Sequence, residues 1–193
     1  MLALCSGSRM KFLLALFGFL SLAVTAHAQT VERITISNPG IYRSETEKIE
    51  DAPNSVRGVF RTVRNPQLIE RTERIPGLLG THFGVNFEIA GQTNGAPVTI
   101  RFLTRFPVPG LRDPKTGKTL LTSENDRQFR VGEFAYRGFT FDESWEIVPG
   151  VWTFEFWHEG KLLAAQKFEI VKTDPPPTQF DGGVDAPSEA TSR

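Results

Sequence analysis

The segment 146–171 constrains the fold more than any other part of the chain. Trp152, Phe154 and Phe156 lie at alternating positions, and apolar residues alternate again after the polar turn His158–Lys161. Alternation with period two on both sides of a glycine-containing turn predicts an antiparallel hairpin with one buried face. The second strand of this hairpin is expected to bury Leu162, Ala164, Phe168 and Ile170.

Two upstream segments repeat this alternation. Residues 83–89 place Phe83, Val85, Phe87 and Ile89 on one face, and residues 98–106 do the same with Val98, Ile100, Phe102, Thr104 and Phe106. Shorter strands are expected at 31–37, 41–43, 68–75, 129–131 and 134–141. Segment 44–55 is expected to be a loop, and segment 110–126 is expected to be largely loop and hairpin.

Residues 56–65 allow two interpretations. Val56, Val59, Phe60 and Val63 have a helical spacing, but Gly58 and the β-branched side chains favour a strand. We favour the strand. About seven to nine short strands and no long amphipathic helix predict an all-β fold, an antiparallel immunoglobulin-like β-sandwich.

The first 28 residues have the three parts of a secretory signal peptide. Lys11 is basic, residues 12–24 form an apolar run, and small residues end at Ala28. An apolar run of this length is too short for a membrane span, which needs about 20 residues. We expect cleavage after Ala28 and an extracytoplasmic location, periplasmic or secreted. Met10 is an alternative start, because residues 1–9 add nothing that such a signal requires.

The remaining chain is expected to form one domain and a tail. Residues 29–172 would be a single β-sandwich domain, because the strand pattern stops at the prolines 175–177, which cannot donate to a sheet ladder. Residues 173–193 are rich in Pro, Gly and Ser and are expected to be disordered.

Charge and cysteine content narrow the possible functions. The chain has 22 basic and 22 acidic residues, and cleavage would remove two basic ones, leaving a charge of −2. A near-neutral chain gives no reason to expect a nucleic-acid partner. The single cysteine, Cys5, lies in the signal peptide, so the mature chain is expected to have no disulfide or thiolate metal site.

Three short motifs suggest a family relationship. They are Ile-Pro-Gly-Leu-Leu-Gly-Thr-His-Phe-Gly-Val at 75–85, Trp-Glu-Ile-Val-Pro-Gly-Val-Trp at 145–152, and Gly-Lys-Leu-Leu-Ala at 160–164 followed by Phe168. This combination resembles a family of short bacterial domains of unknown function, family 3859. The resemblance extends from about Ile34 to Val171. It implies an uncharacterised exported domain and offers no catalytic residues to carry over.

Motifs for phosphate or metal binding have simple structural alternatives. Gly117-Lys118-Thr119 resembles the end of a P-loop, but Arg112 stands where the first glycine is required. We interpret segment 113–118 as a β-turn with Pro114 and Gly117 at its special positions. His82 and His158 show no ligand spacing and are expected to be partly exposed, so no metal site and no cofactor are predicted.

Catalysis has little support in the sequence. The mature chain lacks a cysteine and a G-x-S-x-G nucleophile motif. Asp142, Glu143 or Glu146 could in principle form the carboxylate pair of a glycoside hydrolase, and this remains an alternative. Because no group of residues meets the requirements of an active site, we predict that the protein is not an enzyme.

Arginines are the most suggestive chemical feature. They are dense at positions 57, 61, 64, 71, 74, 101 and 105. Arg101 and Arg105 share a strand face and are the candidate ligand-binding residues, because guanidinium groups favour carboxylates and phosphates. The simpler alternative is a set of surface arginines paired with Glu70, Glu73 and Glu88.

The expected function is therefore broad. We predict a non-catalytic binding or structural module of the bacterial cell envelope. Its partner would be another envelope protein or an anionic ligand, and no stable membrane span would remain after cleavage of the signal.

Overall fold

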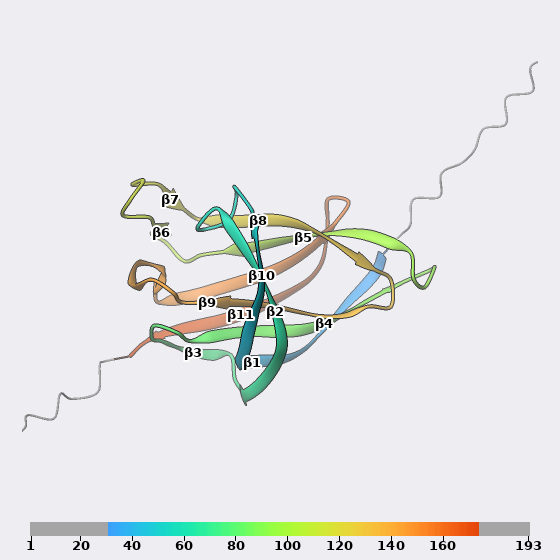
Figure 1. The fold of residues 1–193 in the computed structure, drawn as a ribbon, viewed down its shortest axis with the longest axis horizontal. Coiled ribbons are helices and arrows are strands. Elements are labelled where there is room, and N and C mark those ends of the chain that lie inside the picture. The colour runs from blue at the N-terminus through green and yellow to red at the C-terminus, as the bar shows by residue number, and fades with distance from the viewer. Residues whose placement is uncertain (1–30, 174–193) are drawn as a thin grey trace, which may run out of the picture.

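The computed structural model describes residues 31–173, which form two packed β-sheets (Figure 1). Sheet A has the order β2–β1–β4–β9, with the bounds Val59–Arg71, Val31–Asp51, His82–Gly91 and Phe134–Thr140. Sheet B has the order β3–β11–β10–β5–β8, with the bounds Arg74–Gly77, Lys161–Lys172, Gly150–His158, Pro97–Arg105 and Thr122–Arg130. The predicted β-sandwich is confirmed. The predicted signal peptide and nearly all of the predicted tail lie outside the described residues.

Smaller elements complete the described part of the chain. A separate hairpin pairs β6 (Leu111–Arg112) with β7 (Thr119–Leu120), and a 3-10 helix η1 spans Ser144–Glu146. All but one of the strand pairs are antiparallel; β3 runs parallel to β11. Within residues 31–173, no helix is long and apolar enough to cross a membrane.

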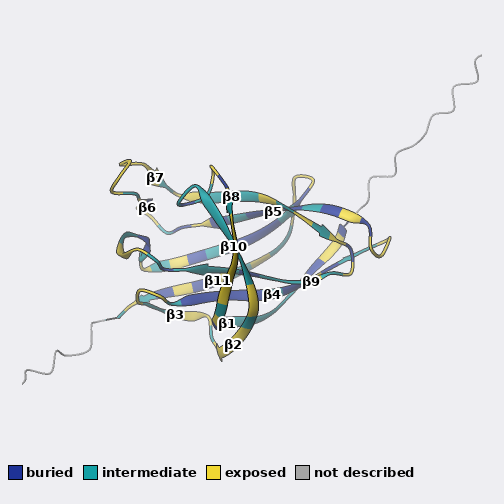
Figure 2. Ribbon diagram, in the orientation of Figure 1, coloured by how far each residue is buried: buried dark blue, intermediate teal, exposed yellow. Residues whose placement is uncertain are grey.

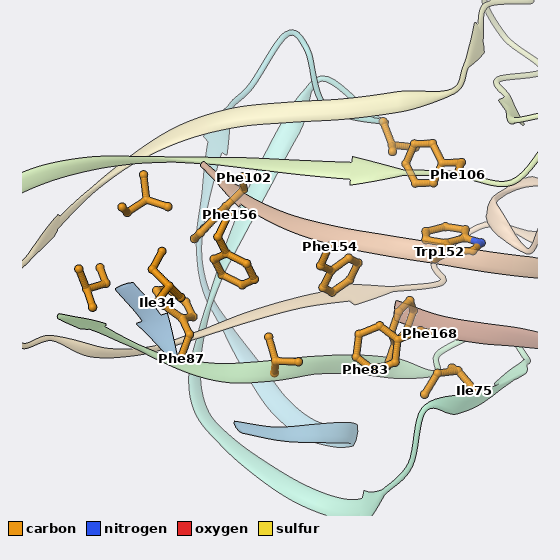
Figure 3. Close-up of a cluster of buried hydrophobic side chains, with 14 of the residues drawn as sticks. Ile34, Ile75, Phe83, Phe87, Phe102, Phe106, Trp152, Phe154, Phe156 and Phe168 are labelled. Atoms are coloured by element: carbon orange, nitrogen blue, oxygen red, sulfur yellow. The ribbon is translucent and has the colours of Figure 1, made fainter. Parts of the chain in front are cut away.

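Aromatic rings from the two sheets form the core (Figure 3). Phe83 and Phe87 on β4 face β10, where the ring centroid of Phe83 lies 5.6 Å from that of Phe154 and that of Phe87 lies 5.0 Å from that of Phe156. Trp152 is fully buried, and Figure 2 shows buried residues along much of β4 in the middle of the sandwich. The alternation predicted for 83–89, 98–106 and 152–156 is therefore confirmed.

The β10–β11 hairpin departs from the prediction near its turn. A register shift lies between Phe156 and Trp157, whose partners are Ala164 and Leu162. The extra residue reverses the facing of the start of β11, so Leu162 is 44% exposed although the sequence predicted it to be buried. A β-bulge of this kind cannot be seen in a period-two pattern.

Strand boundaries also differ from the predictions. Segment 44–55 was expected to be a loop, yet residues 44–51 continue β1, which is 21 residues long. Strand β8 begins at Thr122, well before the predicted 129–131. Both segments are polar, and their backbones are held by pairing with neighbouring strands. The favoured strand within 56–65 is confirmed from Val59 onward.

The β1–β2 hairpin of sheet A extends beyond its neighbour β4 as a long arm, residues 42–68. Residues 31–41 of β1 pair with β4, whereas the arm has only its own β1–β2 pairing. Figure 1 shows the hairpin running steeply across the other strands toward β8. The arm begins after Gly40, where a Cβ would collide with the carbonyl oxygen of Glu70. The backbone of Asn54, in the turn of the arm, accepts a hydrogen bond of 3.2 Å from the backbone of Glu124 on β8.

Candidate functional site

The arm lies over a partly open cavity of about 1100 Å³. Its walls come from the arm and from β8 and β9, the edge strands of the two sheets. The arm therefore covers the open side of the sandwich and leaves a chamber beneath it.

Positive side chains dominate the charged lining of this arm cavity. Five arginines face two carboxylates: Arg43, Arg57, Arg61, Arg127 and Arg137 against Glu133 and Asp142. Guanidinium groups carry their charge at every physiological pH and bind carboxylates and phosphates with paired donors. Arg57 and Arg61 pair with Asp142, and Arg127 pairs with Glu50, so any attraction for an anion comes from the arginines without such a partner in the described chain.

Ion pairs hold the arm to the sandwich at two places. At one, Arg57 and Arg61 both donate to Asp142, and the Arg61 bond is 2.5 Å long. At the other, Arg127 on β8 donates to Glu50 and, at 3.1 Å, to the hydroxyl of Thr62. Hydrogen bonds from Lys48 and Arg127 lower the pKa of Glu50 to about 2. These contacts connect the arm to the sandwich on both sides of the cavity.

Arg137 lies at the inner wall and is almost fully buried. Its Nη1 donates to the backbone carbonyl of Glu155 at 2.7 Å, and its Nη2 donates to the hydroxyl of Thr104 at 2.8 Å. Its guanidinium carbon lies 4.6 to 5.1 Å from the ring centroids of Phe102, Phe154 and Phe156. These two hydrogen bonds use two of the five N–H donors of the guanidinium.

Burial makes the charged form of Arg137 energetically unfavourable. No carboxylate among residues 31–173 lies within ion-pair distance of its guanidinium. Burial lowers the pKa of Arg137 to about 9, and the charge of Glu155 offsets only part of this effect. An arginine at this pKa is still protonated at pH 7. The buried cation therefore lacks an adjacent anion while lining a cavity that has room for one.

A neutral polar cluster forms the sheet A wall of the cavity. Nδ1 of His82 lies 2.8 Å from the hydroxyl of Thr140, and Nε2 lies 3.0 Å from the hydroxyl of Tyr136. A neutral imidazole satisfies both contacts, because one ring nitrogen donates and the other accepts. Burial lowers the pKa of His82 to about 4 and raises that of Tyr136, so both stay uncharged at neutral pH.

Two glycines make room for this cluster. Gly84 and Gly138 are cross-strand partners on β4 and β9, and a Cβ on either one would collide with the hydroxyl of Tyr136. The ring of Tyr136 also lies 4.7 Å, between centroids, from that of Tyr42 on the arm. The sheet A wall is therefore tightly fitted.

The predicted site residues Arg101 and Arg105 lie elsewhere. They share one face as expected, on the outer side of sheet B, and do not line the arm cavity. Arg101 makes two hydrogen bonds to Asp126, and Arg105 makes two to Glu155. These pairings raise the pKa of both arginines.

The arginines singled out in the sequence do not pair as expected. None of their ion pairs within residues 31–173 involves the predicted partners Glu70, Glu73 and Glu88. Their partners there are instead Glu45, Asp126, Asp142, Glu146, Glu155 and Glu169.

Two of the three carboxylates considered for glycoside hydrolysis, Asp142 and Glu146, are engaged by the fold. Glu146 is fully buried, and its Oε2 accepts hydrogen bonds from the backbone N–H groups of Asp142 and Glu143, at 2.8 and 3.0 Å. Its Oε1 lies 3.1 Å from Nε of Arg57. Burial raises the pKa of Glu146, although Arg57 opposes this effect. Glu146 is the third residue of η1, and its side chain accepts a hydrogen bond from the backbone of the N-cap residue Glu143, as in a capping box.

The two histidines are more buried than the sequence predicted. His82 is 8% exposed and His158 is 9% exposed, since each packs within a sheet and makes hydrogen bonds there. Within residues 31–173 no group of three or more metal-ligating side chains comes together.

Segment 113–118 forms the predicted turn. Gly117 has a φ of 70°, and the side chain of Asp113 accepts hydrogen bonds from the backbone of Lys115 and the hydroxyl of Thr116.

The sequence interpretation missed Arg137 as a site residue. The signal was available in the parity of β9, where Ala135, Arg137 and Phe139 share the inward face. An arginine between two inward-facing apolar positions of a strand is expected to be buried. Buried charged side chains are rare in proteins unless they are paired or have a function. His82 was noticed, but its partner Tyr136 is distant in the sequence.

Comparison with known proteins finds the same architecture in a solved structure. The chain is similar to an immunoglobulin-like protein from Pseudomonas aeruginosa, with 22% identity and a TM-score of 0.51 over 75% of this chain and 99% of the other. At this identity the likeness shows the fold alone, and it confirms the predicted immunoglobulin-like class. None of the curated proteins matches the sequence. The family model described as a domain of unknown function, DUF3859, matches residues 30–170, which confirms the resemblance seen in the sequence motifs. The chain therefore belongs to the DUF3859 family.

Proposed function

We propose that the protein is an exported, non-catalytic binding module of the bacterial cell envelope whose ligand is an anionic small molecule held in the arm cavity. The single observation that carries the ligand class is Arg137, a buried cation without an adjacent carboxylate, on the wall of a large cavity. The candidate ligand-binding role moves to Arg137, because a carboxylate pairs with Arg101 and with Arg105, whereas none among residues 31–173 lies within ion-pair distance of Arg137.

The size and lining of the cavity fit a small ligand. Its volume of about 1100 Å³ slightly exceeds the usual range of small-molecule sites, roughly 300–1,000 Å³. Arg137 stands at the inner wall, and Arg57 and Arg61 stand on the arm. An anion beside Arg137 would gain a charge-assisted hydrogen bond in a partly desolvated site, where such bonds are stronger than at the surface.

Two features favour binding over catalysis. Asp142 accepts hydrogen bonds from two arginines, and Glu146 is buried as a cap, so neither carboxylate is placed to protonate a glycosidic oxygen. His82 is hydrogen-bonded at both ring nitrogens, and its low pKa makes it a weak base. Export is supported by the signal-like residues 1–28.

The test is the replacement of Arg137 by methionine. A methionine of similar length fills the space between the three Phe rings, and removing a buried charge in this way is often neutral for stability or stabilising. Thermal unfolding would be followed with phosphate, sulfate, citrate and succinate, each against sodium chloride of equal ionic strength. At ten times its Kd, a ligand stabilises the wild type by about 1.4 kcal/mol, which is a rise in Tm of roughly 3–6 °C. We expect this rise for at least one anion and its loss in Arg137→Met.

The paired variant Arg101→Met, Arg105→Met is the control. These side chains are half-exposed on the outer face of sheet B, so the double variant tests the other arginine face without entering the cavity. It is expected to keep the full rise in Tm. If the anions stabilise Arg137→Met as well as the wild type, or if the rise disappears only in the control, the proposal is wrong. The absence of stabilisation by every anion in the wild type would also reject it.

A further inference from the structure

The outer face of sheet B carries a second hollow, of about 750 Å³, well separated from the arm cavity by the sheet itself. Its floor consists of outward side chains of three adjacent strands, β8, β5 and β10. The residues that matter here are Asp126 on β8, Arg101, Leu103 and Arg105 on β5, and Trp157 on β10.

The strand register places these side chains in rows across the sheet. Trp157 lies opposite Arg101, which lies opposite Asp126. In the next row, Glu155 lies opposite Leu103. Because side chains two positions apart on a strand share a face, the indole of Trp157 borders both Arg101 and Leu103 on one continuous surface.

Both arginines of this hollow are paired with carboxylates, and the lining residues Glu124 and Glu159 add further negative charge. Arg101 binds both oxygens of Asp126, at 2.8 and 3.2 Å, and Arg105 binds both oxygens of Glu155, at 2.5 and 3.3 Å. In the arm cavity Arg137 has no carboxylate within ion-pair distance among residues 31–173, whereas here each guanidinium has one. The hollow therefore offers many hydrogen-bonding groups without a net attraction for anions.

Trp157 is held in place beside these pairs. Its Nε1 donates a hydrogen bond of 2.8 Å to Oε2 of Glu155, the same carboxylate that binds Arg105. The indole is half-buried and its only polar donor is satisfied within the sheet. A ligand that stacks on the ring would meet a surface whose side chains lose little conformational freedom on binding.

This combination matches the chemistry of a sugar ring. A pyranose has one apolar face of C–H groups and a rim of hydroxyls, each of which both donates and accepts hydrogen bonds. An aromatic ring covers the apolar face, and paired guanidinium and carboxylate groups, which retain unused donors and lone pairs, reach the hydroxyls. We infer that the hollow around Trp157 is a second binding site, and that its ligand is a neutral saccharide.

The experiment titrates the mature protein with neutral hexasaccharides of glucose (β-1,4 and α-1,4), mannose, xylose and N-acetylglucosamine. Binding is measured by calorimetry, and the position of the ligand by the indole N–H signal of Trp157 in NMR spectra. We expect at least one saccharide to bind and to shift this signal. Trp157→Ala should weaken binding at least tenfold, and Asp126→Asn, at an exposed position, should weaken it without affecting the fold.

Val151→Ala is the matched control. Val151 lies on the same strand and the same outer face as Trp157 but at the other end of β10, and it is 52% exposed. Its truncation is expected to leave affinity unchanged. The inference is overturned if none of the saccharides binds at 10 mM, or if Trp157→Ala binds as tightly as the wild type. Loss of binding in Arg137→Met with retention in Trp157→Ala would instead place the saccharide in the arm cavity, and would also reject it.

Discussion

The burial of His82 predicts how the stability of the protein depends on pH. Burial lowers the pKa of this side chain to about 4, more than the nearby backbone of Phe139 and the charge of Asp142 raise it. In the unfolded chain a histidine titrates near 6.5. Between these two values the unfolded chain binds more protons than the folded one, so the folded state becomes less stable as the pH falls.

The size of the effect follows from the two pKa values. A difference of about 2.5 in pKa corresponds to about 3 kcal/mol, which is fully present above pH 6.5 and lost as the pH falls toward 4. Between pH 7 and pH 5 the loss should be about 2 kcal/mol. Other groups also titrate in the acid range, so the comparison needs a variant in which only this histidine is absent.

The assay is urea unfolding at pH 7 and pH 5 for the wild type and for His82→Gln. Glutamine can keep a hydrogen bond to Thr140 or Tyr136 but does not titrate. The free energy of unfolding should fall by about 2 kcal/mol more in the wild type than in the variant. Equal falls in the two proteins would refute the reasoning, and so would an NMR titration showing His82 protonated at pH 5 in the folded state.

Three further substitutions test the packing. Trp152→Ala removes a fully buried ring and should cost about 3–5 kcal/mol in urea unfolding; a cost below about 1 kcal/mol would contradict its place in the core. Glu155→Ala should lower the free energy of unfolding by roughly 1–3 kcal/mol, because it leaves Arg105 and Trp157 without their acceptor. The control Glu88→Ala, at an exposed position, should change it by no more than about 0.5 kcal/mol. Equal effects of the two substitutions would show that the Glu155 contacts contribute nothing to stability. Gly84→Ala should lower Tm by several degrees, since its Cβ would collide with the hydroxyl of Tyr136 and the carbonyl of Arg137. An unchanged Tm would mean that β9 can shift away from the added methyl group at little cost.

Glu155 illustrates where sequence patterns mislead. Its parity correctly places it on the outer face of β10, and an outward glutamate is normally solvated. The structure instead buries it to 7% exposure, because Arg105 from the neighbouring strand and Trp157 from its own strand cover it. The facing of a side chain is a local property of a strand, but its exposure depends on neighbours that only strand pairing supplies.

The arm shows the same limit at the level of whole elements. Segment 44–51 is polar and has no apolar alternation, so it was predicted to be a loop. It becomes a strand because β2 pairs along its length, and two groups of ion pairs fix the hairpin over the open side of the sandwich. Pairing energy between two polar strands leaves no periodic pattern of hydrophobicity in either one.

The sequence by itself determined the sandwich, its aromatic core and the family, because alternating apolar residues must be buried on one face wherever the strands finally pair. It also showed that Arg101 and Arg105 share a face. Only the tertiary structure decided which arginines are available to bind an anion. That depends on the carboxylates opposite each one, and Asp126 and Glu155 neutralise the pair on sheet B. Folding places Arg137 beside three Phe rings and a cavity but brings no carboxylate of the described chain to it, so its charge is left without a neutralising partner.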